Sequence, residues 1–83
     1  MLMKTTVTKK NVCYGNKRYQ LTYRLLLEDD SYYGVEVICR HQNTVETERI
    51  LIGKNKQKAL KLLRLFAKET VFPVALKETW ENL

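Results

Sequence analysis

The sequence has little glycine, proline or cysteine, and it lacks any long apolar run. Its 83 residues include three glycines, one proline and two cysteines. So few cysteines exclude the disulfide scaffold of a small secreted domain. The longest apolar stretches, residues 25–27 and 50–52, are far shorter than the roughly 20 residues that span a membrane. Residues 1–10 also contain no apolar run of signal-peptide length. We therefore expect a cytoplasmic protein that does not enter a membrane.

Metal-ligating and nucleophilic side chains are also scarce. Cys39 and His41 stand two positions apart, and Cys13 is the other cysteine. A structural zinc site needs four ligands, usually in close pairs, and a Cys–His nucleophile needs an orienting group. The sequence shows neither a second close pair nor an orienting signature. We therefore expect two half-buried thiols, no metal and no cofactor.

The chain is too short for a deep cleft between two domains. A single core typically organises about 100–150 residues, so residues 1–83 are expected to form one domain. The composition, 45% hydrophobic and 29% charged residues, is typical of a folded globular domain and argues against disorder.

Strand-like alternation dominates the first half of the sequence. Five apolar or aromatic residues alternate with polar ones between positions 17 and 28: Tyr19, Leu21, Tyr23, Leu25 and Leu27. This period of two is typical of a half-buried strand. Further strands are expected at residues 3–14, 32–40 and 45–52, separated by turns at residues 15–16, 29–31 and 42–44. Short links favour antiparallel pairing of successive strands, so we expect a four-stranded meander.

Two helical patterns follow the strands. Asn55 is a suitable N-cap for a helix that runs to about Thr70. The apolar side of this helix comprises Ala59, Leu60, Leu62, Leu63, Phe66 and Ala67. Pro73 fits the first turn of a second helix, on which Leu76, Trp80 and Leu83 share one side. The predicted fold is therefore α+β in the order ββββαα, with the first helix packed on one face of the antiparallel sheet.

The last part of the sequence, residues 66–83, resembles the end of a family of small uncharacterised proteins from clostridia-like Gram-positive bacteria. Members of that family have a strand-rich first half, a helix of leucines and charged residues, and a short Val-x-Pro-Val-x-Leu helix that is acidic near its close. The matching positions are Val71, Pro73, Val74, Leu76, Glu81 and Leu83. Phe72 differs from the small polar N-cap expected there, and Asn82 replaces a commoner acidic residue. The resemblance implies an α+β fold in a bacterial cytoplasm. It implies no activity, because the family is a domain of unknown function.

Positive charge is distributed unevenly along the chain. The net charge is +6, yet residues 1–27 and residues 53–68 each hold six basic and no acidic side chains. Between these basic blocks, residues 28–52 hold two basic and six acidic side chains. This pattern predicts a polarised protein surface.

Six cations gather at the start and along one side of the first predicted helix: Lys54, Lys56, Lys58, Lys61, Arg64 and Lys68. We call these six residues the basic stripe. Its first three lysines crowd the positive end of the helix dipole, where backbone N–H groups attract anions. An anion site is one interpretation. Solvated lysines, or lysines paired with Glu46 and Glu48, are the other.

Nucleic acid is one partner that the basic stripe would suit. Cations on a sheet edge and two tyrosines would extend the contact: Lys9, Lys10, Lys17, Arg18, Tyr14 and Tyr32. Against this interpretation, the acidic block would repel phosphates. The sequence also shows no RNP-type strand and no helix-turn-helix spacing.

Two other features favour a protein partner. Trp80 and Leu83 lie on the second predicted helix, and tryptophan is favoured at interfaces because it buries a large area and keeps a polar handle. Trp80 would equally well close the end of the core. The strand at residues 45–52 is expected at an edge of the sheet, where it is open to a second copy of the chain or to an extended peptide.

Candidate catalytic groups have simpler explanations. His41 beside Cys39 has no third partner, and Asp29-Asp30 is typical of a turn. A third group, Glu36, Glu46 and Glu48, is explained by cross-strand pairing with Arg40 or Arg49. We therefore expect no enzyme. The sequence predicts a non-enzymatic protein-interaction or regulatory module, and the alternative is a nucleic-acid-binding protein that uses the basic stripe.

Overall fold

The computed structural model describes residues 2–29 and 31–83. Met1 and Asp30 lie outside the described residues, so the predicted turn at residues 29–31 is described only in part. The strands are β1 (Leu2–Tyr14), β2 (Lys17–Glu28), β3 (Tyr32–His41) and β4 (Thr44–Gly53), and the helices that follow are α1 (Lys56–Lys68) and α2 (Pro73–Glu81). The predicted α+β fold in the order ββββαα is confirmed.

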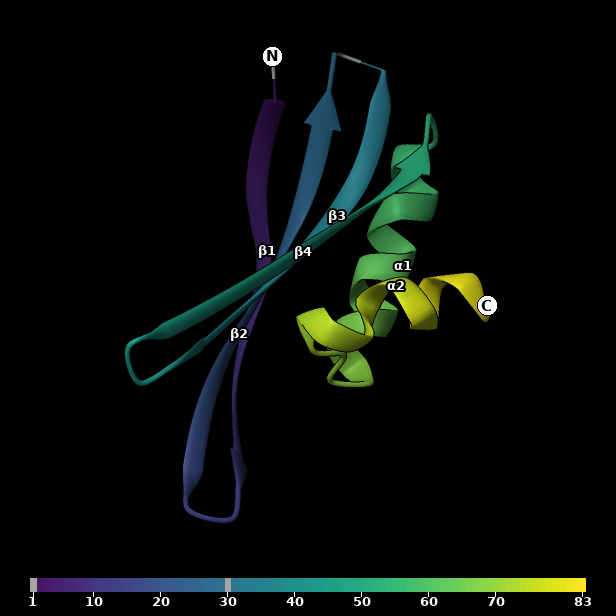
Figure 1. The fold of residues 1–83 in the computed structure, drawn as a ribbon. Helices are drawn as coiled ribbons and strands as arrows, with labels where there is room; N and C mark the ends of the chain where they lie inside the picture. Colours follow the sequence, from purple (N-terminus) through teal and green to yellow (C-terminus); the bar gives the residue numbers. More distant parts are fainter. Residues whose placement is uncertain (1, 30) are drawn as a thin grey trace.

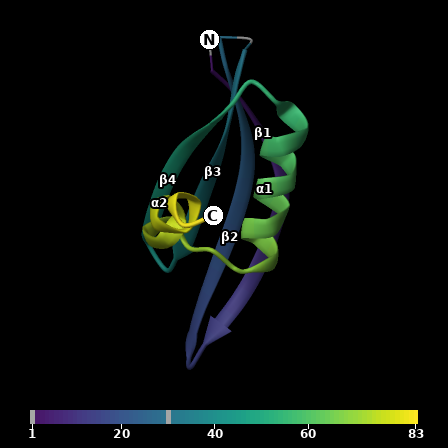
Figure 2. The same cartoon turned by 90° about the vertical axis from the view of Figure 1, so that its right-hand side faces the viewer.

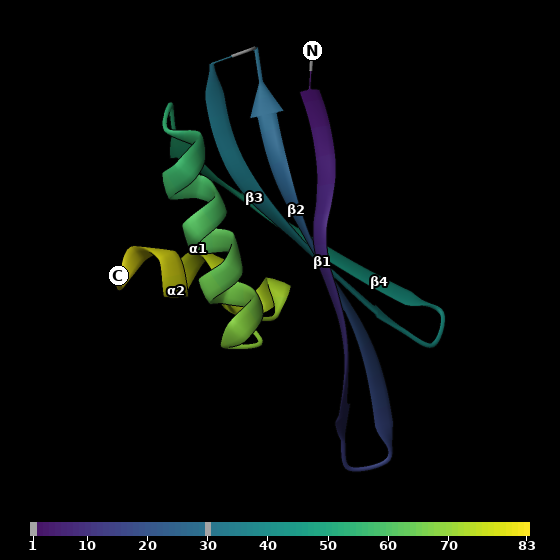
Figure 3. The same ribbon diagram turned by 180° about the vertical axis from the view of Figure 1, so that it is seen from behind.

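The sheet is an antiparallel meander with the strand order β1-β2-β3-β4. Its strands are long and strongly twisted, and both helices lie on one side of it (Figure 1). Seen from that side, α1 lies toward β1 and β2, while α2 lies toward β4 (Figure 2). The view from behind again shows both helices on one side of the sheet, with the hairpin of β1 and β2 reaching beyond them (Figure 3). One face of the sheet is therefore covered by helices, and we call the other the open face.

The hydrophobic core lies between the sheet and the two helices. Its fully buried side chains come from both layers: Leu21, Tyr23, Val35, Val37, Ala59, Leu63, Phe66 and Leu76. The first helix contacts the sheet as predicted. Two of its residues that were expected to be buried, Leu60 and Leu62, are half-buried instead.

Both ends of α1 are fixed by hydrogen bonds. The Asn55 side chain accepts from the Lys58 N–H at 3.1 Å, which confirms the predicted N-cap. The helix ends at Lys68 rather than near Thr70, because Thr70 takes a positive φ of 56°. The Thr70 N–H then donates to Ala67 O at 3.2 Å and the Val71 N–H to Phe66 O at 2.9 Å, which is the Schellman motif.

Lys10 of β1 ties the sheet to this end of α1. Its ammonium donates to Ala67 O at 2.9 Å and to Thr70 Oγ1 at 2.7 Å. A cation at a helix C-terminus also interacts favourably with the helix dipole. Lys10 is thus engaged in the fold, and its role in a nucleic-acid contact stays a prediction.

Tyr23 links β2 to the connection between the helices, because its buried hydroxyl donates to Val71 O at 3.0 Å. Burial, with a smaller effect from the charges of Cys39 and Tyr14, raises the pKa of the Tyr23 phenol to about 12. The folded protein therefore holds the phenol neutral at pH values where the unfolded chain ionises it.

Replacing Tyr23 by phenylalanine is expected to lower the free energy of unfolding by about 1 kcal/mol at neutral pH, because Val71 O loses its donor. The pKa of Tyr23 is higher in the folded protein than in the unfolded chain, so the wild-type protein loses stability as the pH rises from 10 to about 12. Tyr23→Phe has no phenol at this position and does not undergo the loss of stability that its ionisation causes. Urea unfolding of both proteins at pH 7 and pH 11 should show their difference shrinking. An unchanged difference would contradict the prediction.

Candidate functional site

The open face of the sheet concentrates arginine. Strand alternation and the pairing register place six cations on it: Lys4, Lys9, Arg18, Arg24, Arg40 and Arg49. Four of the chain's five arginines are in this set, and the fifth lies on α1. In the part of the chain that the structure describes, Glu28 and Glu36 are the acidic residues on this face. The open face is therefore strongly basic.

Glu36 lies at the centre of the open face. On β3 it is paired with Arg24 of β2 on one side and Arg49 of β4 on the other. Arg49 Nε and Lys4 Nζ donate to Glu36 Oε2, the latter at 3.3 Å, and Arg24 Nη1 lies 3.7 Å from Oε1. Three cations from three strands thus converge on one carboxylate. We call these four residues the Glu36 cluster.

The Glu36 cluster has a buried floor and an accessible rim. The Glu36 side chain is 1% exposed, whereas those of Lys4 and Arg24 are 31% and that of Arg49 is 48% exposed. Long basic side chains can cover a neighbour with their stems and keep their charged heads in water. Among the described residues, buried Arg24 Nε and Glu36 Oε1 have no hydrogen-bond partner. The cluster therefore presents positive charge to solvent.

Apolar side chains add to the open face. Four large ones are between 39% and 57% exposed: Leu2, Tyr32, Val45 and Leu51. Leu2, Tyr32 and Leu51 lie near one end of the strands, and Lys54 Nζ sits 5.9 Å from the centre of the Tyr32 ring. Arginine beside exposed aromatic and aliphatic groups is typical of protein interfaces.

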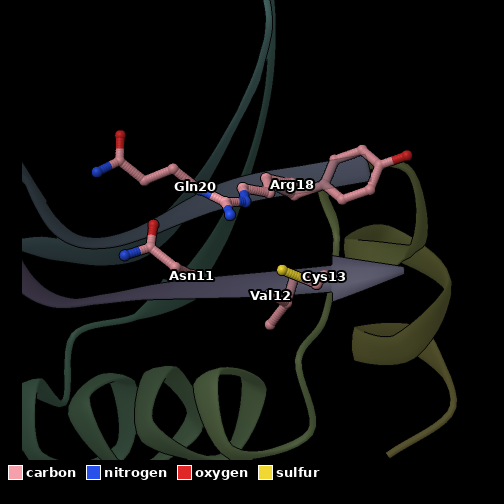
Figure 4. Close-up of a pocket in the computed structure, with 6 residues that line it drawn as sticks. Asn11, Val12, Cys13, Arg18 and Gln20 are labelled. Carbon is pink, nitrogen blue, oxygen red and sulfur yellow. The ribbon is translucent and has the colours of Figure 1, made fainter. Parts of the chain in front are cut away.

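The opposite end of the open face is polar. Here a hollow of about 410 Å³ lies on the hairpin of β1 and β2. Asn11 is paired with Gln20 there, and Cys13 with Arg18 (Figure 4). This end exposes two amides and a guanidinium.

Four residues of the basic stripe lie on the outer surface of α1, away from the open face, whereas Lys54 follows β4 and lies beside Tyr32 of the open face. Lys58, Lys61, Arg64 and Lys68 line a hollow of about 530 Å³ on the outer surface of α1, together with Leu62 and Leu65. The predicted anion site needs free backbone N–H groups at the start of the helix. One of these groups, the Lys58 N–H, already donates to the Asn55 side chain. Within the described residues, no ion pair joins these lysines to Glu46 or Glu48.

Most of the predicted combinations of residues are not brought together. Glu36 lies on the open face, whereas Glu46 and Glu48 are on the helix side of β4, opposite Cys39 and Val37. The predicted Glu36–Arg49 pair is present, but Arg40 is paired with Gln20 and Val45. The three glutamates lie on adjoining strands as predicted, but the register places Glu36 on the opposite face of the sheet from the other two.

The two tyrosines proposed as a stacking surface are also separated. Tyr14 packs on the helix side, with its ring centre 5.9 Å from that of Phe72, whereas Tyr32 is on the open face.

The two residues predicted as a protein interface near the end of the chain differ in exposure. Trp80 is half-buried and packs against the core, and Leu83 is 64% exposed.

The two cysteines lie on opposite faces of the sheet, and the histidine is held beside a tyrosine. Cys13 is exposed on the open face, and Cys39 is buried on the helix side. His41 stacks on Tyr19 at 4.5 Å between ring centres, and its Nδ1 hydrogen-bonds Arg18 O at 2.8 Å. Burial, and to a lesser extent Glu46, raise the pKa of the Cys39 thiol, which disfavours the nucleophilic thiolate.

Residues 2–29 and 31–83 include no group of three or more histidine, cysteine or acidic side chains arranged to hold a metal ion. Cys39, His41 and Glu46 do line one small hollow of about 210 Å³. None of the described helices has the length and apolar character needed to cross a membrane.

The model of DUF6514, a family of unknown function, matches residues 3–83. No curated protein and no solved structure matches the chain. The match spans the sheet and both helices, and it confirms the resemblance of residues 66–83 at the level of a family of unknown function. The clostridial origin and the Val-x-Pro-Val-x-Leu motif stay predictions.

Proposed function

The chain belongs to DUF6514, a family of unknown function, and from this premise we propose that it is a non-enzymatic interaction module that docks an acidic partner protein on its open face. One observation carries the proposal. The open face combines four of the five arginines with four exposed apolar side chains, and no helix among the described residues covers it.

The composition of the two basic surfaces favours the open face as the interface. Arginine is enriched at protein interfaces, whereas lysine is depleted there. The cations of α1 are mainly lysines, and those of the open face are mainly arginines. A guanidinium also binds carboxylates in a bidentate manner, which a lysine cannot do. The basic stripe therefore fits a solvated surface, and the open face fits a docking surface.

Charge determines which kind of partner fits. A second copy of the chain docked face to face would bring the cations of both open faces together, and like charges across an interface are unfavourable. An acidic surface complements these cations, while Leu2, Tyr32 and Leu51 provide apolar area to bury. The partner is thus an acidic protein rather than a second copy through this face. A homodimer through the edge of β4 stays a separate prediction.

The remaining groups support a binding role in the cytoplasm. The thiol of Cys39 is buried and held protonated. Cys13 and Cys39 lie on opposite faces of the sheet, so they are not placed to form a disulfide with each other. Two unpaired thiols suit a reducing compartment.

Site-specific photo-cross-linking tests the proposal. We expect a photo-reactive residue at Thr47, exposed on the open face, to cross-link an acidic protein in the cells that make this chain. A matched probe at Lys61 on α1 should not do so. With the partner purified, Arg18→Glu with Arg40→Glu should weaken binding about tenfold or more, because both guanidinium groups are exposed on the proposed interface.

The control reverses the same number of charges elsewhere. Lys58→Glu with Lys68→Glu changes the outer surface of α1 and should leave the affinity unchanged. Cross-links from Lys61 alone, or equal losses in the two double variants, would contradict docking on the open face.

Nucleic-acid binding by the basic stripe is the second candidate, favoured by the absence of acidic side chains from the sequence of α1. Anisotropy of labelled single- and double-stranded oligonucleotides separates the two functions. Under the proposal above, oligonucleotides bind weakly and only at low salt. Binding that persists near 0.15 M salt and is lost in Lys58→Gln with Lys61→Gln would instead support the nucleic-acid function.

A further inference from the structure

The Glu36 cluster carries more positive charge than its own carboxylate neutralises. Lys4, Arg24 and Arg49 contribute three positive charges and Glu36 one negative charge, so two remain. A buried carboxylate in such a cluster is weak evidence for a stabilising role. It does hold side chains from three different strands close to one point on an otherwise solvent-facing surface. Glu36 is therefore a positioning residue for the three cations.

Most hydrogen-bond donors of this cluster are not used within it. An arginine has five N–H donors. In the Glu36 cluster, Arg49 donates one bond to the carboxylate, and Arg24 approaches no nearer than 3.7 Å. Buried Arg24 Nε has no acceptor among the described residues. The exposed ends of Lys4, Arg24 and Arg49 therefore offer several hydrogen-bond donors around the buried, negatively charged carboxylate of Glu36.

Both charge and shape select the anion that would complete this arrangement. A carboxylate carries one negative charge and two oxygens in a plane, so it would leave one positive charge unmatched. A phosphoryl monoester carries close to two negative charges at neutral pH and has three acceptor oxygens. Three cations from β1, β2 and β4 match its three oxygens, and the residual charge of the cluster matches its dianion.

We propose that Lys4, Arg24 and Arg49, positioned by Glu36, form a binding site for a dianionic phosphoryl group on the open face. This inference rests on the proposed function, because it names the group that a docked partner would present there. A phosphorylated side chain is the source that fits an acidic partner protein. The terminal phosphate of an oligonucleotide and inorganic phosphate share the same chemistry.

Two ligands of similar shape but different charge test the site. The ¹⁵N-labelled full-length chain is titrated in chloride buffer with phenyl phosphate and, separately, with phenyl sulfate, which carries one negative charge. We expect saturable shifts of the Arg24 and Arg49 Nε–H signals with phenyl phosphate and at least about fivefold weaker binding of phenyl sulfate. The affinity for phenyl phosphate should fall as the pH drops through its second pKa near 6.

Two double variants with the same loss of charge locate the binding. Arg24→Gln with Arg49→Gln should weaken phenyl phosphate binding about tenfold or more, and Lys58→Gln with Lys61→Gln on α1 should not change it. If the arginine variant does not fold, Lys4→Gln, which keeps both guanidinium groups beside Glu36, should weaken binding by about threefold. Equal affinity for the two esters, or shifts confined to α1, would overturn the site.

Competition identifies the source of the phosphoryl group. A phosphoserine peptide that displaces phenyl phosphate better than its unphosphorylated form supports both the site and the proposed function. Displacement by a 5′-phosphorylated oligonucleotide but not by the phosphopeptide supports the site and overturns the acidic partner protein. Cross-linking at Thr47 without any phenyl phosphate binding overturns the site and leaves the proposed function standing.

Discussion

Gly34→Val is expected to lower the free energy of unfolding by about 3 kcal/mol or more. A Cβ atom at position 34 would overlap the carbonyl oxygen of Ile50 and lie 3.4 Å from Leu51 Cα. Both neighbours are backbone atoms of β4, so no rotation of a side chain relieves the overlap. The pairing of β3 with β4 shifts register beside Gly34, since Tyr33 pairs with Gly53 and Gly34 with Leu51. A larger residue therefore forces the two strands apart.

Gly15→Ala is the matched control for this effect. Gly15 has a positive φ of 63° in the hairpin turn, but nothing lies within 4 Å of its Cβ position. Its substitution should cost about 1 kcal/mol through backbone conformation alone. Urea unfolding of the two variants compares these costs. If Gly34→Val were no less stable than Gly15→Ala, the close approach of β4 at this point would be wrong.

Phe66→Ala is expected to lower the free energy of unfolding by about 3–5 kcal/mol. Phe66 is fully buried between α1 and the sheet, and removing its ring leaves a cavity among its packed neighbours. Domains of this size are stable by only about 4–12 kcal/mol in total. The variant should therefore unfold at a much lower temperature, as followed by far-UV circular dichroism.

The adjacent residue on α1 provides the comparison for Phe66. Leu65 is 37% exposed, so Leu65→Ala keeps the helix propensity and removes few core contacts. Its cost should stay below about 1 kcal/mol. Similar losses from the two substitutions would contradict the packing of α1 on the sheet.

Local sequence patterns predicted the elements well where one physical cause dominates. The alternation of apolar and polar residues predicted both ends of β2. A register shift of one residue would move its apolar side chains to the solvent face. Asn55 marked the start of α1 by its capping side chain. The end of α1 was predicted about two residues too late, because the Schellman motif uses Thr70 in a conformation that threonine rarely adopts.

The candidate site was only partly visible in the sequence. The alternation in β2 predicts that Arg18 and Arg24 share one face, and the sequence predicts that a glutamate on the neighbouring strand faces Arg40 or Arg49. To predict which cations lie side by side on the open face, the register of all four strands must be known. That register shifts between Thr6 and Thr8 in β1 and between Tyr33 and Gly34 in β3. The convergence of Lys4 on Glu36 depends on that register, since the two residues are 32 positions apart.

The order of elements along the chain has a consequence for synthesis on the ribosome. All four strands precede α1 and α2, so the complete sheet emerges before the helices that cover its apolar face. At about 5–20 residues per second, the two helices need roughly 1.5–6 s more. During that interval Leu21, Tyr23 and Val37 have no covering layer. The nascent sheet therefore exposes its apolar face until Phe66 and Leu76 are available to cover it.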